Sequence, residues 1–125
     1  KNIKINVIGD TAEVIGVRKI LDEMIYNLCD NAIKYNKENG IVDIIVSLAD
    51  SKVKLIVRDT GIGIPTAQQS RVFERFYRVD KARSKSIGGT GLGLAIVKHG
   101  AIYHNAEIEL ESKENAGTLV SVIFK

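Results

Sequence analysis

Apolar residues recur with two different spacings along the chain, and this change of period constrains the fold more than any other feature of the sequence. Residues 3–8 alternate apolar and polar side chains, which is the period of a half-buried strand. Residues 17–35 instead place apolar side chains at intervals of three and four, which forms one stripe of an amphipathic helix. The sequence therefore begins with a strand followed by a long helix.

The rest of the chain is expected to form a hairpin, a short helix, a loop, a buried helix and a second hairpin. These elements are expected at residues 41–48, 53–57, 66–73, 92–103, 106–110 and 118–124. This order predicts an α+β fold: a two-layer α/β sandwich in which about three helices cover one face of a mixed five-stranded sheet. Residues 1–125 are long enough for one domain and show no linker or internal repeat, so we expect a single domain.

Composition narrows the classes of partner. Lys and Arg number 18 against 15 Asp and Glu, and this net charge of +3 is scattered along the chain, so nucleic acid is not the expected partner. No apolar run approaches the roughly 20 residues that a bilayer span requires. The single cysteine, Cys29, excludes an internal disulfide and indicates a reducing compartment. These features predict a soluble, intracellular domain.

Two asparagines lie one turn apart on the first predicted helix. Asn27 and Asn31 share a face of that helix with Glu23, Asp30 and Lys34. Asparagine is a mediocre helix former, whereas its amide oxygen is a hard ligand that suits Mg²⁺ beside phosphate oxygens. The pair is therefore a candidate magnesium site, and the alternative is a solvated polar face without a ligand.

Residues 59–65 form the first of two glycine-containing segments. Asp59 ends a predicted strand, and Gly61 and Gly63 allow the backbone to approach a ligand closely. A carboxylate held there can accept a hydrogen bond from the exocyclic amine of adenine, whereas guanine presents a carbonyl oxygen at the same place. The alternative is an ordinary glycine-rich turn after a strand.

Residues 88–94 form the second segment and lead directly into the predicted helix at 92–103. Successive backbone N–H groups at a helix start can bind one anion, so the segment is a candidate phosphate cradle. It matches neither the Walker pattern nor Gly-x-Gly-x-x-Gly after a strand. A purely structural interpretation is less favourable, because each glycine within a helix costs roughly 1 kcal/mol.

Three arginines precede the second glycine segment. Arg71, Arg75 and Arg78 are spaced by four and three residues and alternate with aromatic residues. They could direct guanidinium groups toward a triphosphate while the rings pack the segment against the domain. The alternative is a solvated basic edge.

Four segments, taken in order, resemble the asparagine, first glycine, phenylalanine and second glycine boxes of two-component sensor histidine kinases. They are residues 27–35, 59–65, 73–78 and 88–97. The resemblance implies the catalytic and ATP-binding domain of such a kinase, in the GHKL or Bergerat fold shared with gyrase B, heat-shock chaperone ATPases and mismatch-repair ATPases. It also implies that ATP and Mg²⁺ are held between the asparagine helix and a flexible ATP lid at about residues 75–90.

The resemblance also implies a role for each matching residue. Asn31 corresponds to the principal Mg²⁺ ligand, Asn27 to its neighbour and Asp59 to the acceptor of the adenine amine. The nucleotide is expected to be surrounded by Asn27, Asn31, Lys34, Tyr35, Asp59, Gly61, Gly63, Ile64, Gly89, Thr90, Gly91, Leu92 and Gly93. The expected catalytic residues are Asn27, Asn31, Lys34, Arg71 and Arg78, and the two arginines are expected to contact the γ-phosphate.

The reaction expected from the resemblance is transfer of the γ-phosphoryl group to a histidine. Relatives that hydrolyse ATP carry a glutamate one turn before the metal asparagine, where this chain has Asn27, and an amide cannot deprotonate water. Neither His99 nor His104 is followed by the acidic residue and proline of the family's histidine box. The substrate histidine is therefore expected on a separate dimerisation domain.

The resemblance implies partners and a location as well. They are the phosphoacceptor domain of the same protein, a response regulator downstream, and a cytoplasmic position in a membrane-anchored bacterial homodimer. Two alternatives are a non-catalytic nucleotide-sensing module and a self-contained GHKL-type ATPase. The chain departs from the family pattern at Gly100 and Ala101, where bulky apolar residues are usual.

Overall fold

The computed structural model describes residues 2–74 and 93–125, which form five strands and three helical segments. In chain order they are β1 (Lys4–Gly9), α1 (Arg18–Lys34), β2 (Ile41–Ala49), β3 (Lys52–Asp59), η1 (Thr66–Arg71), α3 (Gly93–Tyr103), β4 (Glu107–Lys113) and β5 (Gly117–Phe124). No helix within these two ranges is long and apolar enough to cross a membrane.

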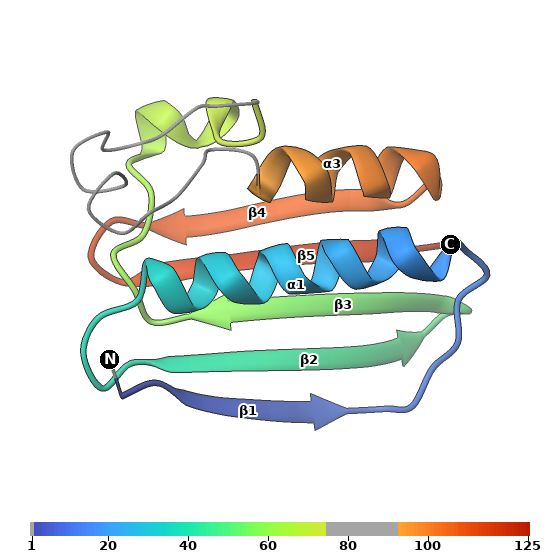
Figure 1. Ribbon diagram of the computed structural model, residues 1–125, viewed down its shortest axis with the longest axis horizontal. Helices are drawn as coiled ribbons and strands as arrows, with labels where there is room; N and C mark the ends of the chain where they lie inside the picture. Colours follow the sequence, from blue (N-terminus) through green and yellow to red (C-terminus); the bar gives the residue numbers. More distant parts are fainter. Residues whose placement is uncertain (1, 75–92) are drawn as a thin grey trace.

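The five strands form one mixed sheet in the order β1-β2-β3-β5-β4. β1 runs parallel to β2, and the other neighbouring pairs are antiparallel. Figure 1 shows α1 and α3 side by side on one face of this sheet, with α1 over the central strands and α3 beside β4. The predicted α+β fold, a two-layer sandwich on a mixed five-stranded sheet, is therefore confirmed.

The core lies between the two helices and the inner face of the sheet. Its buried members come from both helices and from three strands of the sheet: Met24, Leu28, Ala32, Val42, Leu55, Val57, Val97, Ala101, Val120 and Val122. The α1 members recur every fourth residue, and the strand members recur every second residue, as the sequence periods predict. Burying each Val, Leu or Met side chain of this core contributes about 1.5–3 kcal/mol relative to leaving it exposed.

Gly100 lies where α1 and α3 pack most closely. A Cβ atom at this position would come within 2.6 Å of Met24 Cγ and would also approach Ile20. The small residues at Gly100 and Ala101, which depart from the family pattern, thus admit the Met24 side chain into the core. The same region carries His104, whose Nε2 accepts the Val17 N–H at 3.0 Å, so Nδ1–H donates to the Gly100 carbonyl at 2.8 Å.

Several predicted elements differ from the structure at their ends, and β4 extends three residues beyond the end of the strand expected at 106–110. The first hairpin has longer strands than expected because its connection is only Asp50 and Ser51, with φ values of 53° and 61°. This pair of left-handed residues matches the twist of the strands, as in a two-residue hairpin loop. The short helix expected at 66–73 is a 3₁₀ helix that ends at Arg71.

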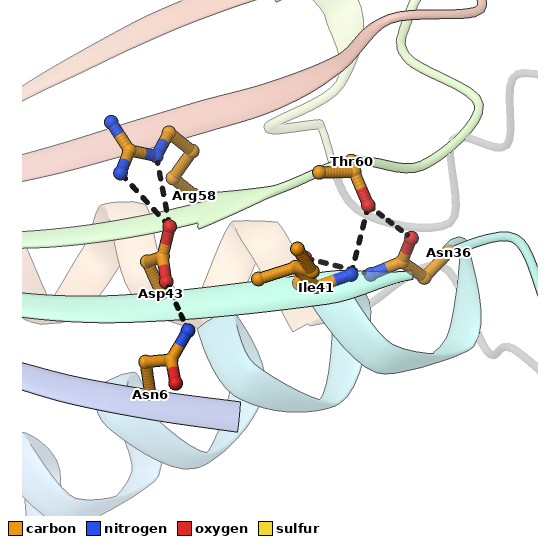
Figure 2. Close-up of polar contacts among 6 residues, drawn as sticks. All are labelled: Asn6, Asn36, Ile41, Asp43, Arg58 and Thr60. Atoms are coloured by element: carbon orange, nitrogen blue, oxygen red, sulfur yellow. Dashed lines mark hydrogen bonds and ion pairs between the residues drawn. The ribbon is translucent and has the colours of Figure 1, made fainter. Parts of the chain in front are cut away.

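The other face of the sheet carries a polar ladder across three strands. Asn6, Asp43 and Arg58 are neighbours in register, and Figure 2 shows them in line. Asp43 accepts the Asn6 side-chain amide at 2.9 Å and Arg58 Nη2 at 2.9 Å. These hydrogen bonds, led by that of Asn6, hold the pKa of the Asp43 carboxyl below its usual value.

Candidate functional site

The two helix asparagines face the first residue of α3. A Cβ atom at Gly93 would lie 3.3 Å from an amide atom of Asn27 and 3.3 Å from one of Asn31. A side chain at this position would therefore contact both amides, so the start of α3 lies beside them. The structure thus places the asparagine face beside Gly93, near the end of the second glycine segment, 62 or more residues away in sequence.

The polar side chains of this face differ in how many hydrogen bonds they already make within the protein. Asn27 donates its side-chain N–H to the Glu23 carbonyl at 2.7 Å, which leaves its oxygen available. The Asn31 amide makes no hydrogen bond with any residue of 2–74 or 93–125. Lys34 pairs with Asp30 at 2.9 Å, and this hydrogen bond raises the pKa of the lysine. Asn31 thus has both donor and acceptor capacity for a ligand.

The first glycine segment packs against the C-terminal end of α1. Ile62 donates its N–H to the Tyr35 carbonyl at 3.0 Å. A Cβ atom at Gly61 would overlap that carbonyl oxygen, so only glycine allows this approach. The chain from Asn31 to Tyr35 therefore joins the asparagine face to the glycine segment within about one turn of helix.

Asn36 fixes the chain where it leaves α1. This side chain is only 4% exposed, donates to the Ile41 carbonyl at 3.1 Å, and accepts the Lys37 N–H at 2.9 Å. Thr60 donates its hydroxyl to Asn36 at 3.1 Å and accepts the Ile41 N–H at 2.9 Å (Figure 2). The amide thereby couples the residue after Asp59 to the end of the asparagine helix.

Asp59 is held by backbone donors through one oxygen. Its Oδ1 accepts the Gly61 N–H at 2.8 Å and the Thr118 N–H at 3.3 Å. Burial raises the pKa of this carboxyl, and the two backbone hydrogen bonds oppose that effect only in part. Among the described residues no donor reaches Oδ2, so this oxygen is available to a ligand amine.

The second glycine of the segment is required by the fold itself. Gly63 has φ = 70°, and a Cβ atom there would overlap the Lys113 carbonyl in the turn that follows β4. Gly61 is similarly required by the Tyr35 carbonyl. Both glycines are therefore explained by contacts with the protein's own backbone, and their predicted role in accommodating adenine stays a prediction.

Sequence reasoning missed three polar residues of this region. Gln69 donates its side-chain amide to the Ile64 carbonyl at 2.9 Å and to the Ser112 carbonyl at 3.0 Å. Ser112 accepts the Ile64 N–H through its hydroxyl at 2.8 Å, and it also contacts Thr118. A signal was present, because Ser112 and Thr118 occupy the inward phase of their strands, where the neighbouring positions are apolar.

Several predicted residues remain to be placed. Arg71 meets Glu74, with 3.3 Å between Arg71 Nε and Glu74 Oε2, and is exposed. Other predictions lie outside the described residues: Arg75, Arg78, Gly89, Thr90, Gly91, Leu92 and the lid at 75–90. The site that the structure describes thus consists of the asparagine face, the Asp59 segment and the first turn of α3.

Comparison with known proteins shows to which family the chain belongs. Residues 16–125 match the model of the histidine kinase-, DNA gyrase B- and HSP90-like ATPases. The chain belongs to this ATPase family. It is 49% identical over 105 residues to the sensor-like histidine kinase SenX3 of Mycolicibacterium smegmatis, a match that covers 84% of this chain and 27% of SenX3. The sensor histidine kinase WalK of Bacillus subtilis is 42% identical over 81% of this chain and 17% of its own length.

Solved structures agree with the sequence relatives. The mycobacterial sensor histidine kinase MprB has a TM-score of 0.87 and 31% identity, covering 98% of this chain and 82% of that chain. Full-length ShkA, crystallised in complex with AMPPNP, has a TM-score of 0.81 and 26% identity over 98% of this chain and 25% of its own. The resemblance to the catalytic domain of sensor histidine kinases is confirmed. The chain spans about a quarter of the length of its SenX3 relatives.

Proposed function

We propose that this chain is the ATP- and Mg²⁺-binding catalytic domain of a sensor histidine kinase, which transfers the γ-phosphoryl group of ATP to a histidine on a separate dimerisation domain. One observation carries the proposal: Asn27 and Asn31 face the first residue of α3, while the same helix ends against the Asp59 segment. A nucleotide lying along this end of α1 would have its base near Asp59 and its phosphates near the two amides.

The residues present fit a magnesium nucleotide. The Asn31 amide has no hydrogen-bond partner within the described chain, and an amide oxygen is a ligand that Mg²⁺ accepts beside phosphate oxygens and water. When bound, Mg²⁺ neutralises charge on the phosphate oxygens. Asn31 is the ligand in this proposal, with Asn27 beside it, and Lys34 adds positive charge to the same helix.

The base end of the site favours adenine. Oδ2 of Asp59 is available as an acceptor, and the exocyclic amine of adenine is a donor. Guanine would place a carbonyl oxygen against the carboxylate, leaving two acceptors opposed in a partly buried position. Gly61, Gly63 and Ile64 supply the backbone beside the base in this proposal.

The attacking group is an imidazole nitrogen from the partner domain. Asn27 cannot accept a proton from water, and its side-chain N–H is already donated to the Glu23 carbonyl. The nitrogen lone pair forms a bond to the γ-phosphorus, the bond to the bridging oxygen breaks, ADP leaves, and the ring loses its proton to solvent. Positioning and electrostatics carry the catalysis, with Arg71 and Arg78 proposed to contact the γ-phosphate.

The whole protein's partners are part of the same proposal, which the names of the relatives support. The named relatives are sensor histidine kinases several times longer than this chain, which leaves room for a phosphoacceptor and dimerisation domain. We include in the proposal a homodimeric, membrane-anchored bacterial protein whose cytoplasmic part contains this domain and passes the phosphoryl group to a response regulator. Nucleic acid has no role in it.

A transfer assay tests the proposal. The chain is mixed with a separately expressed phosphoacceptor domain and ATP labelled at the γ position, and phosphohistidine on that domain is the expected product. Asn31→Ala should abolish the product. Nucleotide binding without transfer would identify a sensing module instead, and multiple-turnover phosphate release from the chain alone, lost in Asn31→Ala, would identify a self-contained ATPase.

A further inference from the structure

Three polar side chains form a row across the inner face of the sheet. Asp59 on β3 is opposite Thr118 on β5, and Thr118 is opposite Ser112 on β4. Each occupies the phase that elsewhere in its strand carries core residues, so all three side chains lie on the side of the helices. The row therefore begins at the carboxylate that reads the base and continues away from it.

The hydrogen bonds of Ser112 determine which way its neighbour's hydroxyl points. Ser112 Oγ lies 2.8 Å from the Ile64 nitrogen, 3.0 Å from the Gly117 carbonyl oxygen and 2.8 Å from Thr118 Oγ1. A serine hydroxyl has one donor and two acceptor positions. The Ile64 N–H can only donate and the Gly117 carbonyl oxygen can only accept. The Ser112 hydroxyl therefore donates its one hydrogen bond to the Gly117 carbonyl. The Thr118 hydroxyl must then donate to Ser112.

This arrangement leaves Thr118 as an acceptor. Its only hydroxyl proton points at Ser112, so any further group that meets Thr118 Oγ1 faces a lone pair. The same residue donates its backbone N–H to Asp59 at 3.3 Å, which places it next to the carboxylate. Asp59 and Thr118 together present acceptors and no side-chain donor.

We propose that Ser112 is a positioning residue for base specificity: by accepting the Thr118 proton, it keeps the base end of the site an acceptor-only surface that selects an amine over a carbonyl. The inference rests on the proposed nucleotide-binding function. Without Ser112, the Thr118 hydroxyl can rotate and donate, and a guanine carbonyl then finds a donor where it met only repulsion.

Ser112 is itself held in place. Gln69 uses both hydrogens of its amide group, one on the Ser112 carbonyl and one on the Ile64 carbonyl. Ile64 donates its N–H to the Ser112 hydroxyl, so the first glycine segment and the end of β4 are joined by one direct hydrogen bond and by the Gln69 amide that bridges them. The serine hydroxyl has no unused hydrogen-bonding position, and its orientation is fixed.

The test compares adenine and guanine nucleotides. Affinities of AMPPNP and GMPPNP with Mg²⁺ are measured by calorimetry for the wild-type chain and for Ser112→Ala. The ratio of adenine to guanine affinity is expected to fall by about 5–10-fold in Ser112→Ala, as for the loss of one neutral hydrogen bond. Ser112→Thr, which keeps a hydroxyl, should retain most of the ratio, and Ser121→Ala, a buried serine of the same hairpin on the other face, should leave it unchanged.

A double variant shows whether Ser112 acts through Thr118. In a Thr118→Val background no hydroxyl remains to be oriented, so adding Ser112→Ala should not change the ratio further. An unchanged ratio in Ser112→Ala, or an equal loss of affinity for both nucleotides, would overturn the inference. If Ser112→Ala does not fold, as judged by circular dichroism, Ser112→Cys replaces it and carries the same expectation, because a thiol is a weak acceptor. Absence of AMPPNP binding to the wild type would overturn the proposed function as well.

Discussion

The two ends of the candidate site differ in how completely the protein satisfies its own polar groups. At the base end, Asp59 Oδ1, Thr118 and Ser112 form hydrogen bonds to one another or to the backbone. At the end proposed for the phosphates, Asn27 donates to the Glu23 carbonyl and Lys34 pairs with Asp30, whereas the Asn31 amide makes no hydrogen bond with the described chain. Apart from Asp59 Oδ2, the polar groups at the end proposed for the base are therefore bonded before a ligand arrives, whereas Asn31 depends on a ligand to satisfy its amide.

Because of this difference, substitutions at the two ends should affect the stability of the fold and the affinity for nucleotide in different ways. A substitution at the base end breaks bonds that the folded chain already makes, so it should change both unfolding and binding. Substitution of Asn31 removes an amide that makes no hydrogen bond in the described chain, so it should change binding and leave unfolding nearly unaffected. Four substitutions test this separation, and a fifth, Asp43→Ala, lies outside both ends.

The largest effect is expected for Asn31→Ala. Loss of a metal-binding amide should weaken binding of the magnesium nucleotide by at least about 10–100-fold, by analogy with losses at metal sites. The midpoint of thermal unfolding without nucleotide should stay nearly constant, because the amide has no partner in the described chain. Calorimetry measures the affinity and thermal melts measure the unfolding midpoint. A large fall in the midpoint would contradict the proposed difference between the two ends.

A matched pair of glycine substitutions sharpens the comparison between the two ends of the site. Gly63→Ala should destabilise the fold by about 2–3 kcal/mol, because φ is positive and the Lys113 carbonyl occupies the space of the new Cβ. Gly93→Ala meets only side-chain amide atoms at 3.3–3.4 Å and should change stability by less than about 0.5 kcal/mol while weakening nucleotide binding. Urea unfolding of both variants should give this order, and the reverse order would contradict it.

Asp59→Asn should raise stability at neutral pH. Burial raises the pKa of this carboxyl in the folded state, so its protonated form is favoured on folding, and stability falls as the pH rises from the ordinary aspartate pKa through the raised value. Asparagine keeps an oxygen for Gly61 and Thr118 but carries no charge. Thermal melts should show a higher midpoint than wild type at pH 7 and no difference below pH of about 3, together with a loss of adenine nucleotide binding.

Asp43→Ala is expected to have the smallest effect and lies outside both ends. Loss of its ion pair with Arg58, which is half exposed, should cost about 0.2–1 kcal/mol. Because hydrogen bonds from Asn6 and Arg58 lower the pKa of Asp43, its contribution is present above the ordinary aspartate pKa and is lost as the pH falls through the lowered value. Urea unfolding at pH 7 and in acid should show this loss, with nucleotide affinity unchanged at pH 7.

Most of the fold was readable from sequence because burial imposes its period on the side chains. The spacing at Met24, Leu28 and Ala32 gave the first helix within one residue at each end. The first hairpin was read with too long a connection, because Asp50 and Ser51 adopt the left-handed conformation without the glycine that usually signals it.

Part of the candidate site could likewise be predicted from the sequence, and part could not. Asn27, Asn31 and Asp59 could be found because each stands in a local pattern, on one helix face or at one strand end. Ser112 and Thr118 could not, because their importance depends on the register between three strands, which joins residues far apart in sequence. Their inward phase marked them as unusual, but only the packed sheet shows what they contact.

The bond between the Thr118 amide and Asp59 has a consequence for the newly made protein. It links residues 59 positions apart, and β5, which supplies Thr118, is the last strand of this domain to leave the ribosome. The carboxylate is synthesised early but lacks this support until translation of the domain is nearly finished. Under the proposed function, nucleotide should therefore stabilise the domain only after β5 is in place, and an adenine-binding signal from a nascent polypeptide would mark the moment at which β5 has docked.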